Sequence, residues 1–136
     1  MRITTVIVLT LTLSVFNIGC DSEPSTTEVN DPVASNSESF MDAIFYSNRG
    51  LAYADQGELD KAFVDYNKAI ELDPAYAGAY YNRGIAHYHQ GELDKAIADY
   101  NKAIELDPQL MRAYNNRGFA YADQGELDKA FVDYNK

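Results

Sequence analysis

Residues 77–110 read AGAYYNRGIAHYHQGELDKAIADYNKAIELDPQL, and the segments on both sides are near copies of this stretch. The tripeptide Asn-Arg-Gly begins at Asn48, Asn82 and Asn116, so the copies are 34 residues apart. The same interval relates three further sets of residues: Gly57, Gly91 and Gly125; Ala62, Ala96 and Ala130; Tyr66, Tyr100 and Tyr134. A fixed period of this length predicts a stacked array of repeats rather than a single closed core.

Each copy predicts a hairpin of two helices. In the central copy, apolar residues from Leu93 to Ile104 recur at the intervals of an amphipathic helix. The preceding segment, residues 79–90, is expected to form its partner helix. Gly91 suits the left-handed conformation that ends a first helix, and Pro108 stops the second. The sequence therefore predicts an all-α fold, an α-solenoid of antiparallel helix hairpins.

The pattern resembles the tetratricopeptide repeat (TPR) family in its small, aromatic and proline positions as well as in its length. The central unit has the residue type that this family prefers at six places: Tyr80, Gly84, Ala96, Tyr100, Ala103 and Pro108. The corresponding structural positions of the flanking units include Gly50, Gly118, Ala62, Ala130 and Pro74. His87 departs from the pattern, because Tyr53 and Tyr121 occupy its place in the other units. We expect Gly84 and Ala96 to be small so that the two helices of a hairpin can approach closely.

The resemblance implies a TPR domain over residues 43–136. It divides into complete units at 43–76 and 77–110 and a truncated third unit at 111–136.

Arginine stands where the family usually has leucine. A lone buried charge is unfavourable, and each of these arginines has an aspartate sixteen residues later. We therefore expect three pairs within hairpins: Arg49 with Asp65, Arg83 with Asp99, and Arg117 with Asp133. Binding of an acidic ligand by these arginines is the alternative.

The first twenty residues are typical of a targeting segment. Arg2 precedes a mainly apolar run, residues 6–18, which is shorter than the ~20 residues that a membrane-spanning helix needs. The run ends at Gly19 and Cys20, which resemble the lipobox of bacterial lipoproteins. This implies a signal peptide at residues 1–19 and a lipid attached to Cys20. An ordinary buried cysteine after an apolar helix is the alternative.

The resemblance to lipoproteins also implies a location. We expect a lipid-anchored protein of the bacterial cell envelope, outside the cytoplasm. Asp21 resembles the inner-membrane retention signal, if the enterobacterial sorting rule applies. Residues 20–42 would join the anchor to the repeats. Residues 21–39 are rich in Ser, Thr, Glu, Asp and Pro, so we expect a flexible tether.

The composition argues against several function classes. A net charge of −10 is unlike that of nucleic-acid-binding proteins. The single cysteine leaves no intrachain disulfide. His87 and His89 lie on different faces of a helix, so we expect an aromatic core position for His87, a solvated one for His89, and no metal site. We can place no nucleophile and base pair and no phosphate-binding glycine loop, so we expect neither an enzyme nor a cofactor.

The family resemblance implies that one face of the first helices forms an inner groove for a peptide or a partner helix. Asn48, Asn82 and Asn116 form a ladder there, and an amide can both donate to and accept from a peptide backbone. The surrounding positions are Ser47, Leu51, Tyr81, Ile85, Arg112, Asn115 and Phe119. A solvated polar face without a ligand is the alternative. The lysine and arginine clamp of some TPR proteins is incomplete here, and an acidic protein suits a neutral or mildly basic peptide.

The third unit stops early, at Lys136, and this predicts an exposed apolar edge. That edge would comprise Leu127, Ala130, Phe131 and Tyr134 and could pack on a second copy of the chain. Residues 48–68 and 116–136 differ at one position, which suggests internal duplication.

The leading functional hypothesis is a protein-protein interaction scaffold or adaptor that binds a peptide or partner protein through the groove in the cell envelope. A truncated, non-functional remnant of a longer array and the regulatory arm of an envelope enzyme are the alternatives.

Overall fold

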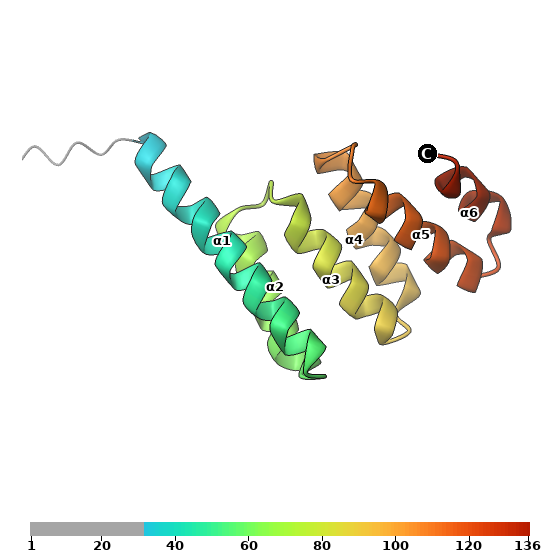
Figure 1. Ribbon diagram of the computed structural model, residues 1–136, viewed down its shortest axis with the longest axis horizontal. Helices are drawn as coiled ribbons and strands as arrows, with labels where there is room; N and C mark the ends of the chain where they lie inside the picture. Colours follow the sequence, from blue (N-terminus) through green and yellow to red (C-terminus); the bar gives the residue numbers. More distant parts are fainter. Residues whose placement is uncertain (1–31) are drawn as a thin grey trace, which may run out of the picture.

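The computed structural model describes residues 32–136, which form six helices and, within this range, no strands (Figure 1). The helices are α1 (Pro32–Asp55), α2 (Leu59–Leu72), α3 (Ala77–His89), α4 (Leu93–Leu106), α5 (Met111–Asp123) and α6 (Leu127–Tyr134). The predicted signal peptide, Cys20 and Asp21 lie outside the described residues. In the part that is described, no helix is both long enough and apolar enough to cross a membrane.

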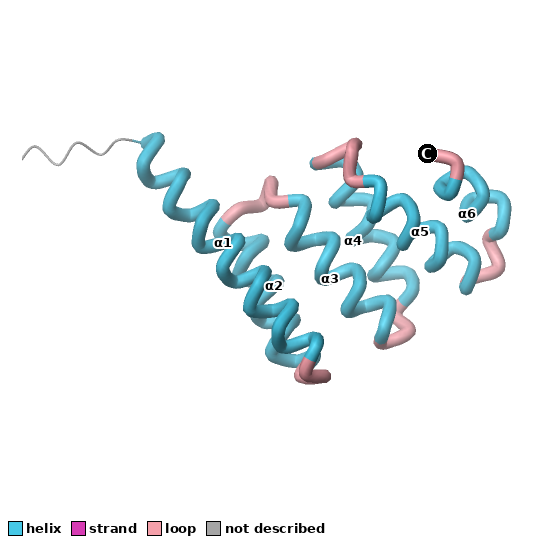
Figure 2. Tube along the Cα trace, viewed as in Figure 1, coloured by secondary structure: helices cyan, strands magenta, loops and turns pink. Residues whose placement is uncertain are grey.

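The helices form three consecutive hairpins, α1 with α2, α3 with α4, and α5 with α6, joined by short loops (Figure 2). The first helices contact one another along the array, α1 with α3 and α3 with α5. Among the described helices, α2, α4 and α6 make no contact of this kind with one another. The layer of first helices is therefore the tighter one, so the array curves with α1, α3 and α5 on its inner face. This confirms the predicted all-α solenoid of helix hairpins.

Small residues let the two helices of each hairpin approach closely. A Cβ atom added to Gly84 would lie 2.8 Å from Cε1 of Tyr100 and 3.3 Å from the carbonyl oxygen of Ala96. Tyr100 and Ala96 are themselves buried. Gly50 and Gly118 meet the corresponding tyrosines of their own hairpins in the same way. The structure confirms the predicted role of these small residues.

The hairpin turns have the conformation that the glycines predict. Gly57, Gly91 and Gly125 follow the first helix of each hairpin with φ angles of 78°, 76° and 81°. This is the left-handed region, which glycine adopts without steric penalty. The second helices α2 and α4 end at Leu72 and Leu106, shortly before Pro74 and Pro108. The predicted helix stops are therefore confirmed.

The first helix is longer than predicted. It begins at Pro32, so residues 32–42 are helical, and the expectation of a flexible tether is wrong for them. The ring of Phe40 lies edge-on to that of Tyr76, with 5.8 Å between centroids, and this contact holds the extension against the loop after α2. Phe40 and Met41 follow the polar segment 21–39, and these two large apolar residues were the sequence signal for a packed helix before Ala43.

The predicted apolar edge is formed in part. Leu127 and Phe131 are 67% and 69% exposed, and Tyr134 is also exposed. Ala130 is buried within the hairpin of α5 and α6, because it occupies the close-packing position of that hairpin. Self-association through this edge stays a prediction.

Candidate functional site

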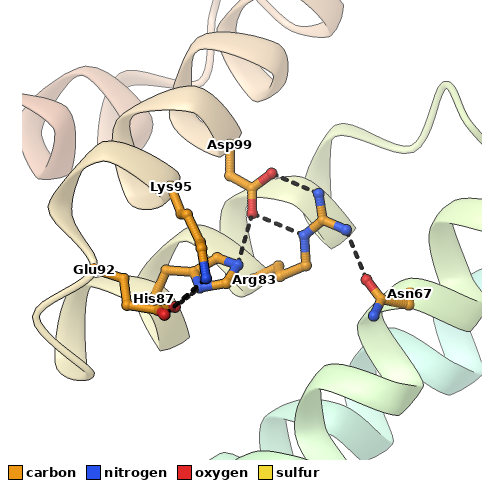
Figure 3. Close-up of polar contacts among 6 residues, drawn as sticks. All are labelled: Asn67, Arg83, His87, Glu92, Lys95 and Asp99. Carbon is orange, nitrogen blue, oxygen red and sulfur yellow. Dashed lines mark hydrogen bonds and ion pairs between the residues drawn. The ribbon is translucent and has the colours of Figure 1, made fainter.

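The three predicted ion pairs are present, and each has two hydrogen bonds. In the central hairpin, Nε and Nη2 of Arg83 donate to the two carboxylate oxygens of Asp99 at 2.8 and 2.7 Å (Figure 3). Asp99 is 6% exposed, so the pair satisfies a buried carboxylate. The bond to Asp99 also raises the pKa of Arg83. Equivalent pairs join Arg49 to Asp65 and Arg117 to Asp133. These arginines therefore hold the hairpins together, which supports the structural role over the ligand-binding one.

Two of these arginines also connect neighbouring hairpins. Nη1 of Arg83 donates to Oδ1 of Asn67 at 2.7 Å (Figure 3), and Nη1 of Arg117 donates to Oδ1 of Asn101 at 2.6 Å. Each arginine thus bridges the aspartate of its own hairpin and an asparagine of the preceding one. Sequence reasoning missed these asparagines, although they share one repeat position.

His87 occupies an aromatic core position, as predicted. It also makes polar contacts that the sequence did not predict. Its ring packs against Phe63 with 4.6 Å between centroids. Nδ1 lies 2.6 Å from Oε2 of Glu92, and Nε2 lies 3.9 Å from Oδ2 of Asp99 (Figure 3). Hydrogen bonds from Lys95 and then from His87 lower the pKa of Glu92. Within residues 32–136, no group of three or more His, Cys, Asp or Glu side chains is arranged to hold a metal ion.

The asparagine ladder is partly engaged in contacts between hairpins. Nδ2 of Asn82 donates to Oγ of Ser47 at 3.1 Å, and Nδ2 of Asn116 donates to the hydroxyl of Tyr81 at 3.2 Å. Both amides are half-buried, whereas Asn48 is exposed. The ladder therefore helps to set the spacing of α1, α3 and α5, besides any role in binding.

Two of the predicted groove residues are buried. Ser47 is fully inaccessible and Tyr81 is 9% exposed. Tyr81 packs in the core with Ile97 and Tyr100, and both Ser47 and Tyr81 accept a hydrogen bond from an asparagine of the next hairpin. The guanidinium of Arg112 also lies 4.7 Å from the ring centroid of Tyr81. For Ser47 and Tyr81 the structure thus differs from the expectation of an accessible side chain.

The accessible part of the inner face contains two adjoining pockets, which we call the inner groove. The first has a volume of about 250 Å³ and lies between α1 and α3, where Leu51, Asp55, Asn82, Ile85 and His89 border it. The second has a volume of about 130 Å³ and lies between α3 and α5, where Ile85, Tyr88, His89, Tyr100, Asn116 and Phe119 border it. Ile85 and His89 border both pockets, so the two adjoin along the inner face.

The structure therefore brings together five of the predicted residues: Leu51, Asn82, Ile85, Asn116 and Phe119. The remaining ones, Asn48, Arg112 and Asn115, are exposed on the first helices but border neither pocket. Sequence reasoning missed Asp55, Tyr88 and His89 as groove residues. The repeat period offered a signal, because Asp55 and His89 occupy the same repeat position, as Asp123 also does.

Comparison with known families identifies one match. The family described as TPR repeat matches residues 50–91 and 86–125, which together make up more than half of the chain. No curated protein sequence gives a significant match.

Solved structures of the same architecture are also similar. The second TPR of Spaghetti (RPAP3), bound to the HSP90 peptide SRMEEVD, has a TM-score of 0.73 at 27% identity, covering 76% of this chain and 90% of that one. The second TPR domain of human RPAP3, in complex with the HSP70 peptide SGPTIEEVD, has a TM-score of 0.67 at 30% identity, covering 71% and 81%. The crystal structure of MamA has a TM-score of 0.66 at 36% identity, covering 68% of this chain and 54% of that one.

Proposed function

Because the chain belongs to the tetratricopeptide repeat family, we propose that it is a protein-interaction scaffold whose inner groove binds a peptide or an extended segment of a partner protein. TPR proteins are generally non-enzymatic interaction modules. The two RPAP3 domains similar to this chain were solved with peptides of HSP90 and HSP70.

The observation that carries this proposal is the pair of adjoining pockets with apolar side chains at their borders. Leu51 and Phe119 are 41% and 49% exposed and stand on either side of Ile85. Covering such side chains stabilises a complex by about 25 cal/mol per Å² of apolar surface removed from water. Asn82 and Asn116 stand beside them and supply polar groups for a backbone. An extended segment can thus place apolar side chains in the pockets and its peptide groups against the amides.

Incorporation of a photocrosslinking amino acid tests the groove. Residues 51 and 119 border the pockets, whereas Val64 on α2 is 68% exposed and borders neither. We expect a discrete crosslinked partner from positions 51 and 119 in cells and none from position 64. Leu51→Lys, introduced together with a crosslinker at position 119, should abolish that product. A product that persists in this variant, or that forms equally from position 64, contradicts binding in the groove.

The proposal includes a place of action, the bacterial cell envelope, with the protein anchored through a lipid on Cys20. What supports this is the apolar run followed by Gly19 and Cys20 in the sequence. We expect the wild-type chain to incorporate a labelled fatty acid and to sediment with membranes, and Cys20→Ser to do neither. Equal labelling of the two chains would contradict the anchor.

A further inference from the structure

The bound segment has a chemistry that the groove itself indicates. Resting on the proposed function, we infer that the inner groove selects a neutral or basic extended segment with two apolar side chains, and that it rejects an acidic carboxyl-terminal tail.

Most of the basic side chains in residues 32–136 are already paired. Within residues 32–136, every lysine and arginine except Arg112 and Lys136 forms an ion pair with a carboxylate of the same chain. The lysines pair with glutamates three residues away, and none of them borders the groove pockets. Arg112 lies over the ring of Tyr81, outside both pockets. The groove therefore offers no cluster of unpaired cations to hold several carboxylates.

Carboxylates stand at the groove instead. Asp55 is exposed and borders the first pocket. Beside the second pocket, the hydroxyl of Tyr88 donates to Oδ2 of Asp123 at 2.6 Å. His89 lies between the two pockets on the same side of the array. With a net charge of −10 on the whole chain, these carboxylates repel an acidic ligand and attract a basic side chain.

The pocket volumes rank the two apolar side chains by size. A closed apolar cavity of ~150 Å³ holds a benzene ring. The first pocket, at about 250 Å³, exceeds this volume and accepts a phenylalanine or leucine side chain. The second pocket, at about 130 Å³, is about half as large and suits a smaller aliphatic side chain such as that of valine.

The spacing of the two anchors follows from helix packing. Neighbouring packed helices are ~8–10 Å apart, and three residues of an extended polyproline II segment span ~9 Å and bring side chains i and i+3 to the same face. The segment therefore carries a large and a small apolar residue about three positions apart, with a lysine or arginine near the large one to pair with Asp55.

Fluorescence anisotropy with the full chain and four labelled peptides of equal length tests this inference. The first peptide has blocked ends, a phenylalanine and a valine three positions apart, and a lysine beside the phenylalanine. The second has glutamate in place of that lysine and a free carboxyl terminus, the third replaces both apolar residues with alanine, and the fourth contains the acidic sequence SRMEEVD. We expect the first peptide to bind at least about tenfold more tightly than each of the others. Raising the salt concentration should narrow its advantage over the second.

Two variants locate the effect. Asp55→Asn should reduce the preference for lysine over glutamate severalfold, whereas Asp42→Asn, an exposed aspartate of the same helix that borders neither pocket, should leave it unchanged. If the glutamate peptide or SRMEEVD binds as tightly as the lysine peptide, the inferred selectivity is wrong while the proposed groove function stands. If none of the four peptides binds, or if Leu51→Lys binds the lysine peptide as tightly as wild type, the proposed groove function fails together with the inference.

Discussion

Alanine substitutions at Gly50, Gly84 and Gly118 distinguish the effect of close packing on stability from the effect of helix propensity. In Gly84→Ala, the new methyl group would lie 2.8 and 2.9 Å from ring carbons of Tyr100, well inside the ~3.5–4.0 Å of a favourable carbon-carbon contact. Tyr100 is 1% exposed and its ring lies 6.2 Å from that of Tyr81, so neighbouring side chains confine it more than they would a ring at the surface. In Gly118→Ala, the methyl group would lie 2.6 Å from the ring of Tyr134, which is 45% exposed and can turn into solvent.

The expected difference follows from this contrast in burial. Overpacking of a buried site destabilises by about 1–3 kcal/mol. Both substitutions also gain ~0.8–1 kcal/mol of helix propensity, which cancels when the two variants are compared. Gly84→Ala should therefore be less stable than Gly118→Ala by about 1–3 kcal/mol. Gly50→Ala should resemble Gly84→Ala, because its partner Tyr66 is also 1% exposed.

Urea unfolding followed by far-ultraviolet circular dichroism measures the three variants against wild type. Equal urea dependence of the unfolding free energy would show that the same surface is exposed in each case. Equal midpoints for Gly84→Ala and Gly118→Ala would refute the argument from tyrosine burial, as would a lower midpoint for Gly118→Ala.

Three further predictions concern the buried interior. Arg83→Ala leaves Asp99 buried without its partner and should destabilise the fold by about 3–5 kcal/mol; a double-mutant cycle with Asp99→Ala that shows no coupling would contradict this. Ala96→Leu should overpack the central hairpin and destabilise the fold by about 1–3 kcal/mol. Ala98→Leu, on the exposed side of α4, should leave the thermal midpoint nearly unchanged. Equal decreases of the thermal midpoint in the two variants would contradict close packing at Ala96. Burial raises the pKa of Tyr66 to about 12, from ~10 in an unfolded chain, so its stabilising contribution is complete below about pH 10 and is lost as the pH rises toward 12. Tyrosinate absorbance recorded during urea unfolding at several alkaline pH values checks this, and ionisation of all tyrosines near pH 10 in the folded state would contradict it.

The features that the sequence predicted are the local ones. The left-handed turn at Gly91 and the helix stop at Pro108 depend on the conformational preferences of single residues, so each can be inferred where it stands. The pairing of Arg83 with Asp99 could be predicted because a buried charge needs a partner and the repeat limits the choice to one hairpin. The small size of Gly84 followed from the same reasoning about one hairpin.

The features that the sequence left undetermined depend on contacts between hairpins. Nothing in the residue pattern shows that Arg83 has a further donor directed at Asn67 of the preceding unit. Tyr81 was expected to be accessible in the groove, but it is buried, and Nδ2 of Asn116 from the next unit donates a hydrogen bond to its hydroxyl. The extension of α1 upstream of Ala43 brings Phe40 into contact with Tyr76 in the loop after α2, and the residue pattern does not show that contact. These outcomes require the spacing between units, which the period alone does not give.

The extra length of α1 ties the direction of its N-terminal end to the orientation of the first hairpin. At about 1.5 Å per residue, its 24 residues span ~36 Å, against ~21 Å for the 14 residues of α2, and its N-terminal end projects beyond the hairpin (Figure 1). Because α1 is one continuous helix, a rotation imposed at Pro32 turns the first hairpin with it. α1 also borders the first pocket, so the direction of its axis and the direction in which the groove faces are linked.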